Sequence, residues 1–137
     1  MSNSAAGRKK TADEISHIVI GSALRVHSEL GPGLLESAYE ACLAHDIRQQ
    51  GLEVVTQLCL PVEYREIKLD AGYRIDVLVE DLVIIEVKAI ERLLPIHHAQ
   101  IISYLRMSKK NLGLLINFNV SHLKHGIKRF VHGTDWK

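Results

Sequence analysis

Two short apolar segments interrupted by charged residues constrain the fold of this chain more than any other feature. Residues 74–79 contain Asp76, and residues 83–89 contain Glu86 and Lys88. Both segments are rich in valine, isoleucine and leucine, which predicts two β-strands. Side chains alternate between the faces of a strand, so Glu86 and Lys88 project to the same side. A carboxylate and an amine are therefore fixed next to each other.

Charged groups in an apolar strand are costly unless they are paired or bind an ion. Two explanations remain open at this point: carboxylates that hold a divalent cation, or a buried network of salt bridges. For Asp76 to share a face with Glu86, the two strands must be antiparallel neighbours with an odd loop such as residues 80–82. A two-residue turn would separate the charges.

The composition is that of one ordinary domain, with 137 residues, 47% hydrophobic and 24% charged, and a formal charge of +1. We expect a flexible N-terminal tail over residues 1–10 and a single domain over residues 11–137. Cys42 and Cys59 lie in apolar sequence surroundings, and no leader is evident, which predicts a cytoplasmic location. No apolar run approaches the roughly 20 residues that span a membrane, so no membrane association is expected.

Hydrophobic periodicity predicts the order α-α-β-β-β-α-β-β. A capping box at Thr11 and Glu14 begins the first helix, Gly51 ends the second, and Pro95 begins the third. We therefore expect an α/β (α+β) fold with a mixed central sheet flanked by helices, its first three strands forming an antiparallel meander. The predicted helices cover residues 12–30, 34–50 and 96–108, and the predicted strands cover residues 54–66, 73–79, 82–89, 112–118 and 127–132.

Glu36 is a further acid of interest. On a helical wheel it lies within about 20° of Leu43 and Ile47, which predicts that it faces the core. It could cap a backbone group or pair with a basic side chain, but we favour the interpretation that it joins the carboxylate cluster. Mg²⁺ needs only one or two carboxylates when substrate phosphate is present, and Asp76 with Glu86 meets that minimum.

The pattern of Asp76 followed by Glu86-Val87-Lys88 on the next strand resembles the PD-(D/E)XK nuclease superfamily. The segment Gly33-Leu34-Leu35-Glu36-Ser37-Ala38-Tyr39 is similar to the signature of the GxxExxY protein family, which belongs to that superfamily. The resemblance extends over about residues 15–132. It implies a restriction-endonuclease-like core and a nuclease that uses Mg²⁺ or Mn²⁺.

The resemblance also implies roles for individual residues. Asp76 and Glu86 would bind the metal, together with the backbone carbonyl of Val87. Lys88 would be the catalytic lysine, and Glu36 would complete the site.

Gln100 and Tyr104 resemble the Q-x-x-x-Y element of RecB-type nucleases and would flank this site. They are about 40° apart on a helix and thus share one face. Without the resemblance, the pair is equally well explained by helix packing and a surface amide. The chain departs from the superfamily at Ile75, where a proline is common, and at His98, where an acid is expected.

Three functional hypotheses follow. The first is a metal-dependent nuclease acting on nucleic acid, with DNA as the expected substrate. The second is a catalytically silent nuclease-fold module that binds nucleic acid or a protein partner. The third is a structural oligomeric domain, since the amphipathic first helix could serve a homodimer. The eight histidines lack the spacing of a structural zinc site.

Overall fold

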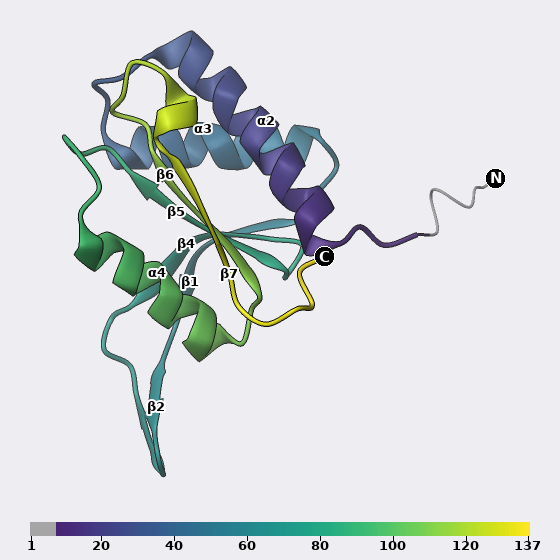
Figure 1. Ribbon diagram of the computed structural model, residues 1–137, viewed down its shortest axis with the longest axis vertical. Helices are drawn as coiled ribbons and strands as arrows, with labels where there is room; N and C mark the ends of the chain where they lie inside the picture. Colours follow the sequence, from purple (N-terminus) through teal and green to yellow (C-terminus); the bar gives the residue numbers. More distant parts are fainter. Residues whose placement is uncertain (1–7) are drawn as a thin grey trace.

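The computed structural model describes residues 8–137, so most of the predicted tail lies outside the described residues. Figure 1 shows a central sheet with helices packed on it. In chain order the elements are α2 (Ala12–Leu30), α3 (Glu36–Gln49), β1 (Val54–Cys59), β2 (Val62–Tyr64), β3 (Ile67–Leu69), β4 (Arg74–Val79), β5 (Val83–Lys88), α4 (Pro95–Ser108), β6 (Leu112–Asn117), a 3-10 turn (Leu123–His125) and β7 (Ile127–Val131).

The main sheet has five strands in the order β1-β4-β5-β6-β7. Strand β5 lies at its centre and pairs in antiparallel fashion with β4 and in parallel with β6. The remaining pairs are antiparallel. The predicted mixed sheet and the meander of β1, β4 and β5 are therefore confirmed.

The two faces of the sheet pack against different helices. Val87 belongs to the core beneath α2 and α3, whereas Ile84 belongs to a smaller core that includes residues of α4. Because side chains alternate along β5, Glu86 and Lys88 project toward the α4 side, as Ile84 does. The strand thus presents its charged residues to the side that is covered by a single helix.

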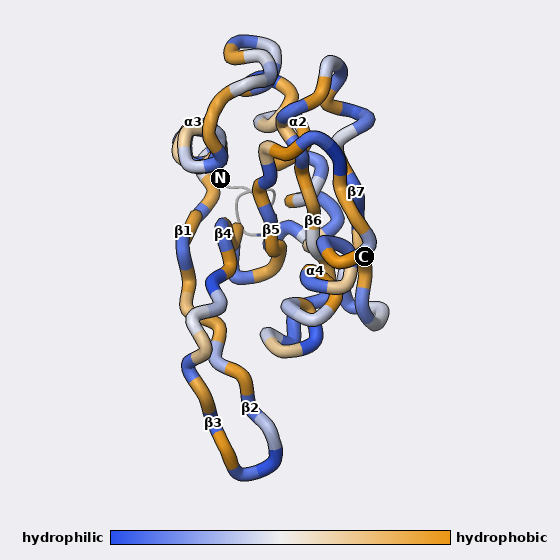
Figure 2. Tube along the Cα trace, turned by 90° about the vertical axis from the view of Figure 1, so that its left-hand side faces the viewer, coloured by the Kyte–Doolittle hydropathy of each residue, from blue (hydrophilic) through white to orange (hydrophobic). Residues whose placement is uncertain are grey.

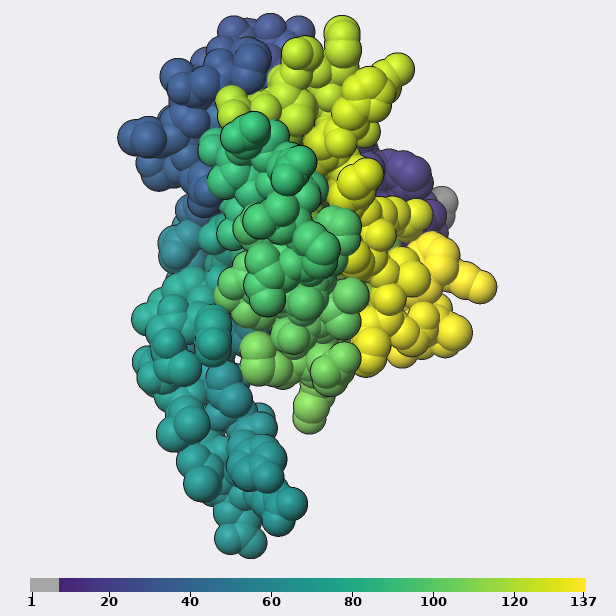
Figure 3. Space-filling model, turned by 60° about the vertical axis from the view of Figure 1, so that its left-hand side comes forward, coloured from purple at the N-terminus to yellow at the C-terminus, as the bar shows by residue number. Residues whose placement is uncertain are grey.

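The predicted strand over residues 54–66 is wrong in its extent. It is divided after Cys59, and the second part pairs with β3 as a separate hairpin. Pro61 lies at the division, where a residue without an N–H group cannot continue the ladder. The hairpin extends away from the body (Figures 2 and 3), and Tyr64 and Ile67 are 61% and 55% exposed on it.

The predicted ends of the helices are largely confirmed. Thr11 and Glu14 form the expected capping box, with N···O distances of 2.9 and 3.1 Å, and Pro95 opens α4. Helix α3 begins at Glu36, two residues later than predicted, because Leu35 has an extended backbone.

Cys42 and Cys59 are both exposed and free, so their apolar sequence neighbours do not bury them. Within residues 8–137, every helix is too short or too polar to cross a membrane.

Tyr39 explains why the Gly33 to Tyr39 segment has its pattern. Its ring is fully buried and stacks on Phe118, with centroids 4.6 Å apart. Its hydroxyl donates to the carbonyl of Gly31 at 2.5 Å and accepts from the amide of Leu34 at 3.1 Å. One side chain therefore fixes the connection between α2 and α3, just before Glu36.

Candidate active site

The site begins where β4 and β5 separate. Their ladder runs to the pair Val77↔Ile85, and the same register continued by one residue places Asp76 opposite Glu86. There the side chains replace the ladder: the amide of Asp76 donates to Glu86 Oε2 at 3.1 Å, and the amide of Val87 donates to Asp76 Oδ2 at 2.8 Å. The predicted odd loop and the convergence of the two acids are present, with Glu80 and Asp81 adopting the left-handed backbone of the loop.

Glu86 is the most perturbed acid of the site. Its side chain is almost fully enclosed at 4% exposure, and its pKa is raised to about 8, with burial as the largest cause. The negative charge of Asp76 contributes to this rise, while the backbone hydrogen bond from Asp76 and the positive charge of Lys88 oppose it. Such a carboxyl would gain from a cation that offsets the loss of water.

Asp76 is half-buried, and burial also raises its pKa. Its hydrogen bonds from the Val87 amide and the Gln57 side chain counteract that effect, as does the charge of Lys88. Both oxygens of Asp76 are therefore oriented by neighbouring groups, at 2.8 Å from Val87 N and 3.3 Å from Gln57 Nε2.

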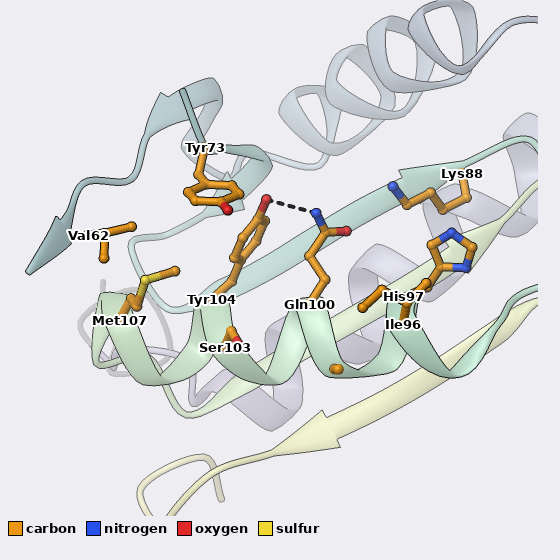
Figure 4. A pocket seen from close by; sticks show the side chains of 10 residues that line it. Val62, Tyr73, Lys88, Ile96, His97, Gln100, Ser103, Tyr104 and Met107 are labelled. Atoms are coloured by element: carbon orange, nitrogen blue, oxygen red, sulfur yellow. Dashed lines mark hydrogen bonds between the residues drawn. The ribbon is translucent and has the colours of Figure 1, made fainter. Parts of the chain in front are cut away.

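Lys88 is the cation of the site. Its charge lowers the pKa of both Asp76 and Glu86, which places the ammonium near the two carboxylates. Among the ion pairs within 4.0 Å in the described part of the chain, none includes Lys88. Its side chain instead lines the cavity next to α4 (Figure 4), where it can reach a bound group.

The predicted burial of Glu36 is wrong, because its side chain is exposed. Helix α3 starts at this residue, so Glu36 lies at the end of the helix, beyond the stripe formed by Tyr39 and Leu43. Its Oε2 nevertheless accepts from the amide of Ala89 at 3.4 Å, at the end of β5. Its charge also contributes to the raised pKa of Asp76, so it lies at the edge of the site.

The structure adds two polar residues that the sequence did not single out. Glu40 lies one helical turn after Glu36 and is half-buried; burial and the charge of Asp76 raise its pKa. Gln57 Nε2 donates to Glu40 Oε1 at 2.8 Å and to Asp76 Oδ1 at 3.3 Å, so one amide bridges the two carboxylates. The four-residue spacing from Glu36 could have suggested Glu40, whereas Gln57 has no local signal.

Gln100 and Tyr104 lie together on α4, as predicted. Gln100 Nε2 donates to the Tyr104 hydroxyl at 3.1 Å (Figure 4). Burial raises the pKa of Tyr104, and the negative charge of Glu86 raises it further, which indicates that the phenol lies close to the acids. Tyr73 packs edge-on against Tyr104, with centroids 6.1 Å apart.

Asn117 is a buried residue that holds the end of β5 in place. It is 2% exposed and pairs with Lys88 in the parallel ladder between β5 and β6. Its side chain accepts from the amides of Ile90 and Asn119 at 3.1 and 3.2 Å and donates to the carbonyl of Ile90 at 2.9 Å. It therefore fixes the path of the chain directly after Lys88.

The donor set fits a hard cation such as Mg²⁺. Asp76 and Glu86 supply carboxylate oxygens. The N–H and C=O groups of a strand residue point to the same edge, so the Val87 carbonyl faces the same gap as its amide. Within residues 8–137, no three or more His, Cys, Asp or Glu side chains form a complete cage. Two carboxylates and a carbonyl suit Mg²⁺, which usually keeps several waters.

The chain matches a known protein family. A family model described as the PD-(D/E)XK nuclease superfamily matches residues 13–130 of the chain. Neither a curated protein nor a solved structure matches the chain. The matched region includes every residue of the site described above.

Proposed function

The chain belongs to the PD-(D/E)XK nuclease superfamily, and from this premise we propose that it is a Mg²⁺-dependent nuclease that hydrolyses phosphodiester bonds in DNA. The observation that supports the proposal is the convergence of Asp76 and Glu86 across β4 and β5: Glu86 accepts from the Asp76 amide, and Asp76 accepts from the amide of Val87, the residue after Glu86. Both acids lie within the electrostatic reach of Lys88.

Asp76, Glu86 and the Val87 carbonyl would hold the metal, with Glu36 at the margin. A bound Mg²⁺ polarises a phosphodiester and lowers the pKa of a water molecule, and Mn²⁺ can supply the same chemistry. The residues that orient the two acids are the backbone amides of Asp76 and Val87 and the side chain of Gln57. These hydrogen bonds preorganise the carboxylates before any cation arrives.

Lys88 would contact the substrate. Its ammonium lines the cavity and forms no close ion pair within residues 8–137, so it can stabilise negative charge on a phosphate oxygen or orient the attacking water. Gln100 and Tyr104 of α4 would form another wall of the cavity that Lys88 lines, with the Tyr104 hydroxyl held by the Gln100 side-chain amide.

The direct test is cleavage of labelled DNA by the purified chain with Mg²⁺, Mn²⁺ or EDTA. Asp76→Asn and Lys88→Met should each reduce the rate by about 100-fold or more, because each removes a charge at the reacting group. Glu63→Gln and Lys68→Met are matched controls, since both residues are exposed on the hairpin. Cleavage that persists in Asp76→Asn and Lys88→Met would refute the proposal.

Calorimetric titration with Mg²⁺ separates binding from turnover. Binding should weaken in Asp76→Asn and in Glu86→Gln, whose side chain keeps its size. A protein that binds Mg²⁺ but cuts neither DNA nor RNA would be the catalytically silent module instead.

Light scattering tests the proposed homodimer. The free thiols Cys42 and Cys59 support the proposed cytoplasmic location, because such thiols persist in a reducing compartment.

A further inference from the structure

A cavity of about 630 Å³ opens directly beside the candidate active site. It lies along α4, which contributes Gln100, Tyr104 and Met107, and it is closed on the other side by Val62 and Tyr73. Lys88 of β5 also lines it. Its volume lies within the range of about 300–1,000 Å³ that is typical of small-ligand pockets.

The lining changes in character from one end to the other. Figure 4 shows the ammonium of Lys88 at one end, the amide of Gln100 in the middle, and Tyr73 with Met107 at the other end. The cavity thus has a cation, Lys88, at one end and an aromatic ring, Tyr73, at the other. A nucleotide has two parts that suit these ends, a phosphate and a flat base.

We propose that this cavity binds one unstacked nucleobase of a single-stranded nucleic acid, with the adjoining phosphate at Lys88. This inference rests on the proposed nuclease function and specifies the form of its substrate. The base stacks on Tyr73, and a phosphate adjoining that nucleotide lies next to the lysine.

The two aromatic rings support the base site for different reasons. Tyr104 is held in place, because its hydroxyl is hydrogen-bonded to Gln100 and its ring is buried. Tyr73 rests edge-on against it and keeps 42% of its surface exposed, so one part of the ring is free to stack. Aromatic side chains arranged along a groove are the usual means by which proteins bind single strands.

The form of the proposed site favours a single strand over a duplex, because a base must be unstacked to reach it. The projecting hairpin beside the cavity has balanced charges, contributed by Glu63, Arg65, Glu66 and Lys68. In a duplex the bases are stacked and paired, and one must be extruded before it can enter such a pocket.

The test uses the full chain in an Asp76→Asn background, where cleavage does not interfere, and fluorescence anisotropy with labelled oligonucleotides. Tyr73→Ala should weaken binding of a single-stranded oligothymidylate by about 5- to 150-fold, the range for loss of one stacked base. Tyr64→Ala is the matched control, since Tyr64 is an exposed tyrosine on the hairpin of β2 and β3 and is not among the residues that line the cavity. Circular dichroism checks that both variants fold.

The same assay with a duplex of equal length should show weaker binding than the single strand, and Tyr73→Ala should leave duplex binding unchanged. A single-stranded RNA arm shows whether the sugar matters, and excess thymidine monophosphate shows whether a free nucleotide suffices. Equal loss in Tyr73→Ala and Tyr64→Ala, or tighter binding of the duplex, would overturn the inference.

These outcomes are distinct from failure of the proposed function. If the wild type cuts DNA and Tyr73→Ala cuts single strands equally well, the base site is wrong and the nuclease remains. If the wild type cuts nothing but binds single strands through Tyr73, the base site stands and the hydrolytic function is wrong.

Discussion

Removing the Tyr39 hydroxyl tests the link between the Gly33 to Tyr39 segment and the fold. Tyr39→Phe keeps the buried ring and its stack on Phe118, with centroids at 4.6 Å, and deletes only the oxygen. Two backbone groups then lose their partner: the Gly31 carbonyl at 2.5 Å and the Leu34 amide at 3.1 Å. The substitution therefore isolates the hydrogen bonds from the packing.

The magnitude follows from what can replace the hydroxyl. Leu34 is 43% exposed, so water can reach its amide, whereas Gly31 is only half-exposed. One poorly replaced partner costs about 1–2 kcal/mol of the free energy of unfolding. Asp76, Glu86 and Lys88 lie on the central strands and not on this connection, so cleavage by the folded variant should be retained.

Urea denaturation followed by circular dichroism measures the change, with Tyr64→Phe as the control. Tyr64 is 61% exposed, and its variant should stay within about 0.5 kcal/mol of the wild type. If Tyr39→Phe is as stable as Tyr64→Phe, the hydroxyl does not organise the connection and the explanation of the segment is refuted.

Three further predictions concern the supports of the site. The pKa of Glu86 is raised from 4.5 to about 8. Without metal, in EDTA, the native state therefore binds the carboxyl proton of Glu86 more tightly than the unfolded chain does. The free energy of unfolding should therefore fall as the pH rises between about 4.5 and 8, and Glu86→Gln should flatten that slope in urea titrations at several pH values; parallel slopes would contradict it. Asn117→Ala removes three hydrogen bonds of a buried side chain and should cost about 2–3 kcal/mol with a lower cleavage rate, since the chain after Lys88 loses its anchor; unchanged stability and rate would show that this anchor is dispensable. Gly126→Ala would place a Cβ 2.2 Å from the Asn117 carbonyl oxygen, so thermal unfolding should reveal a loss of about 1–3 kcal/mol, and a fully stable variant would be inconsistent with that close approach.

The hairpin of β4 and β5 was the best predicted part of the molecule. The alternation of apolar and charged residues in 83–89 placed Glu86 and Lys88 on one face, and the need to bring Asp76 to the same place fixed the centre of the loop at Asp81. The observed register has that centre. This worked because alternation and loop length are local properties of a hairpin, and a shift of one residue would have put apolar residues in the wrong layer.

Glu36 and the strand over residues 54–66 show where local patterns were insufficient. The helical wheel assumed that α3 had begun before Glu36, and a start two residues later moved this acid from the core to the end of the helix. The strand prediction overlooked the interruption at Pro61 and so missed the hairpin of β2 and β3. In both cases the position of an element's end decided the outcome.

The amino-acid sequence by itself determined the β4–β5 hairpin and the convergence of Asp76 with Glu86, because both depend on strand alternation and loop length, which are short-range properties. Only the tertiary structure brought Glu40 and Gln57 to Asp76 and placed Tyr73 against Tyr104. These contacts join residues that are far apart in the chain, and they depend on how helices dock on the sheet and where the projecting hairpin begins. The cavity along α4 is a product of that docking, which no local pattern encodes.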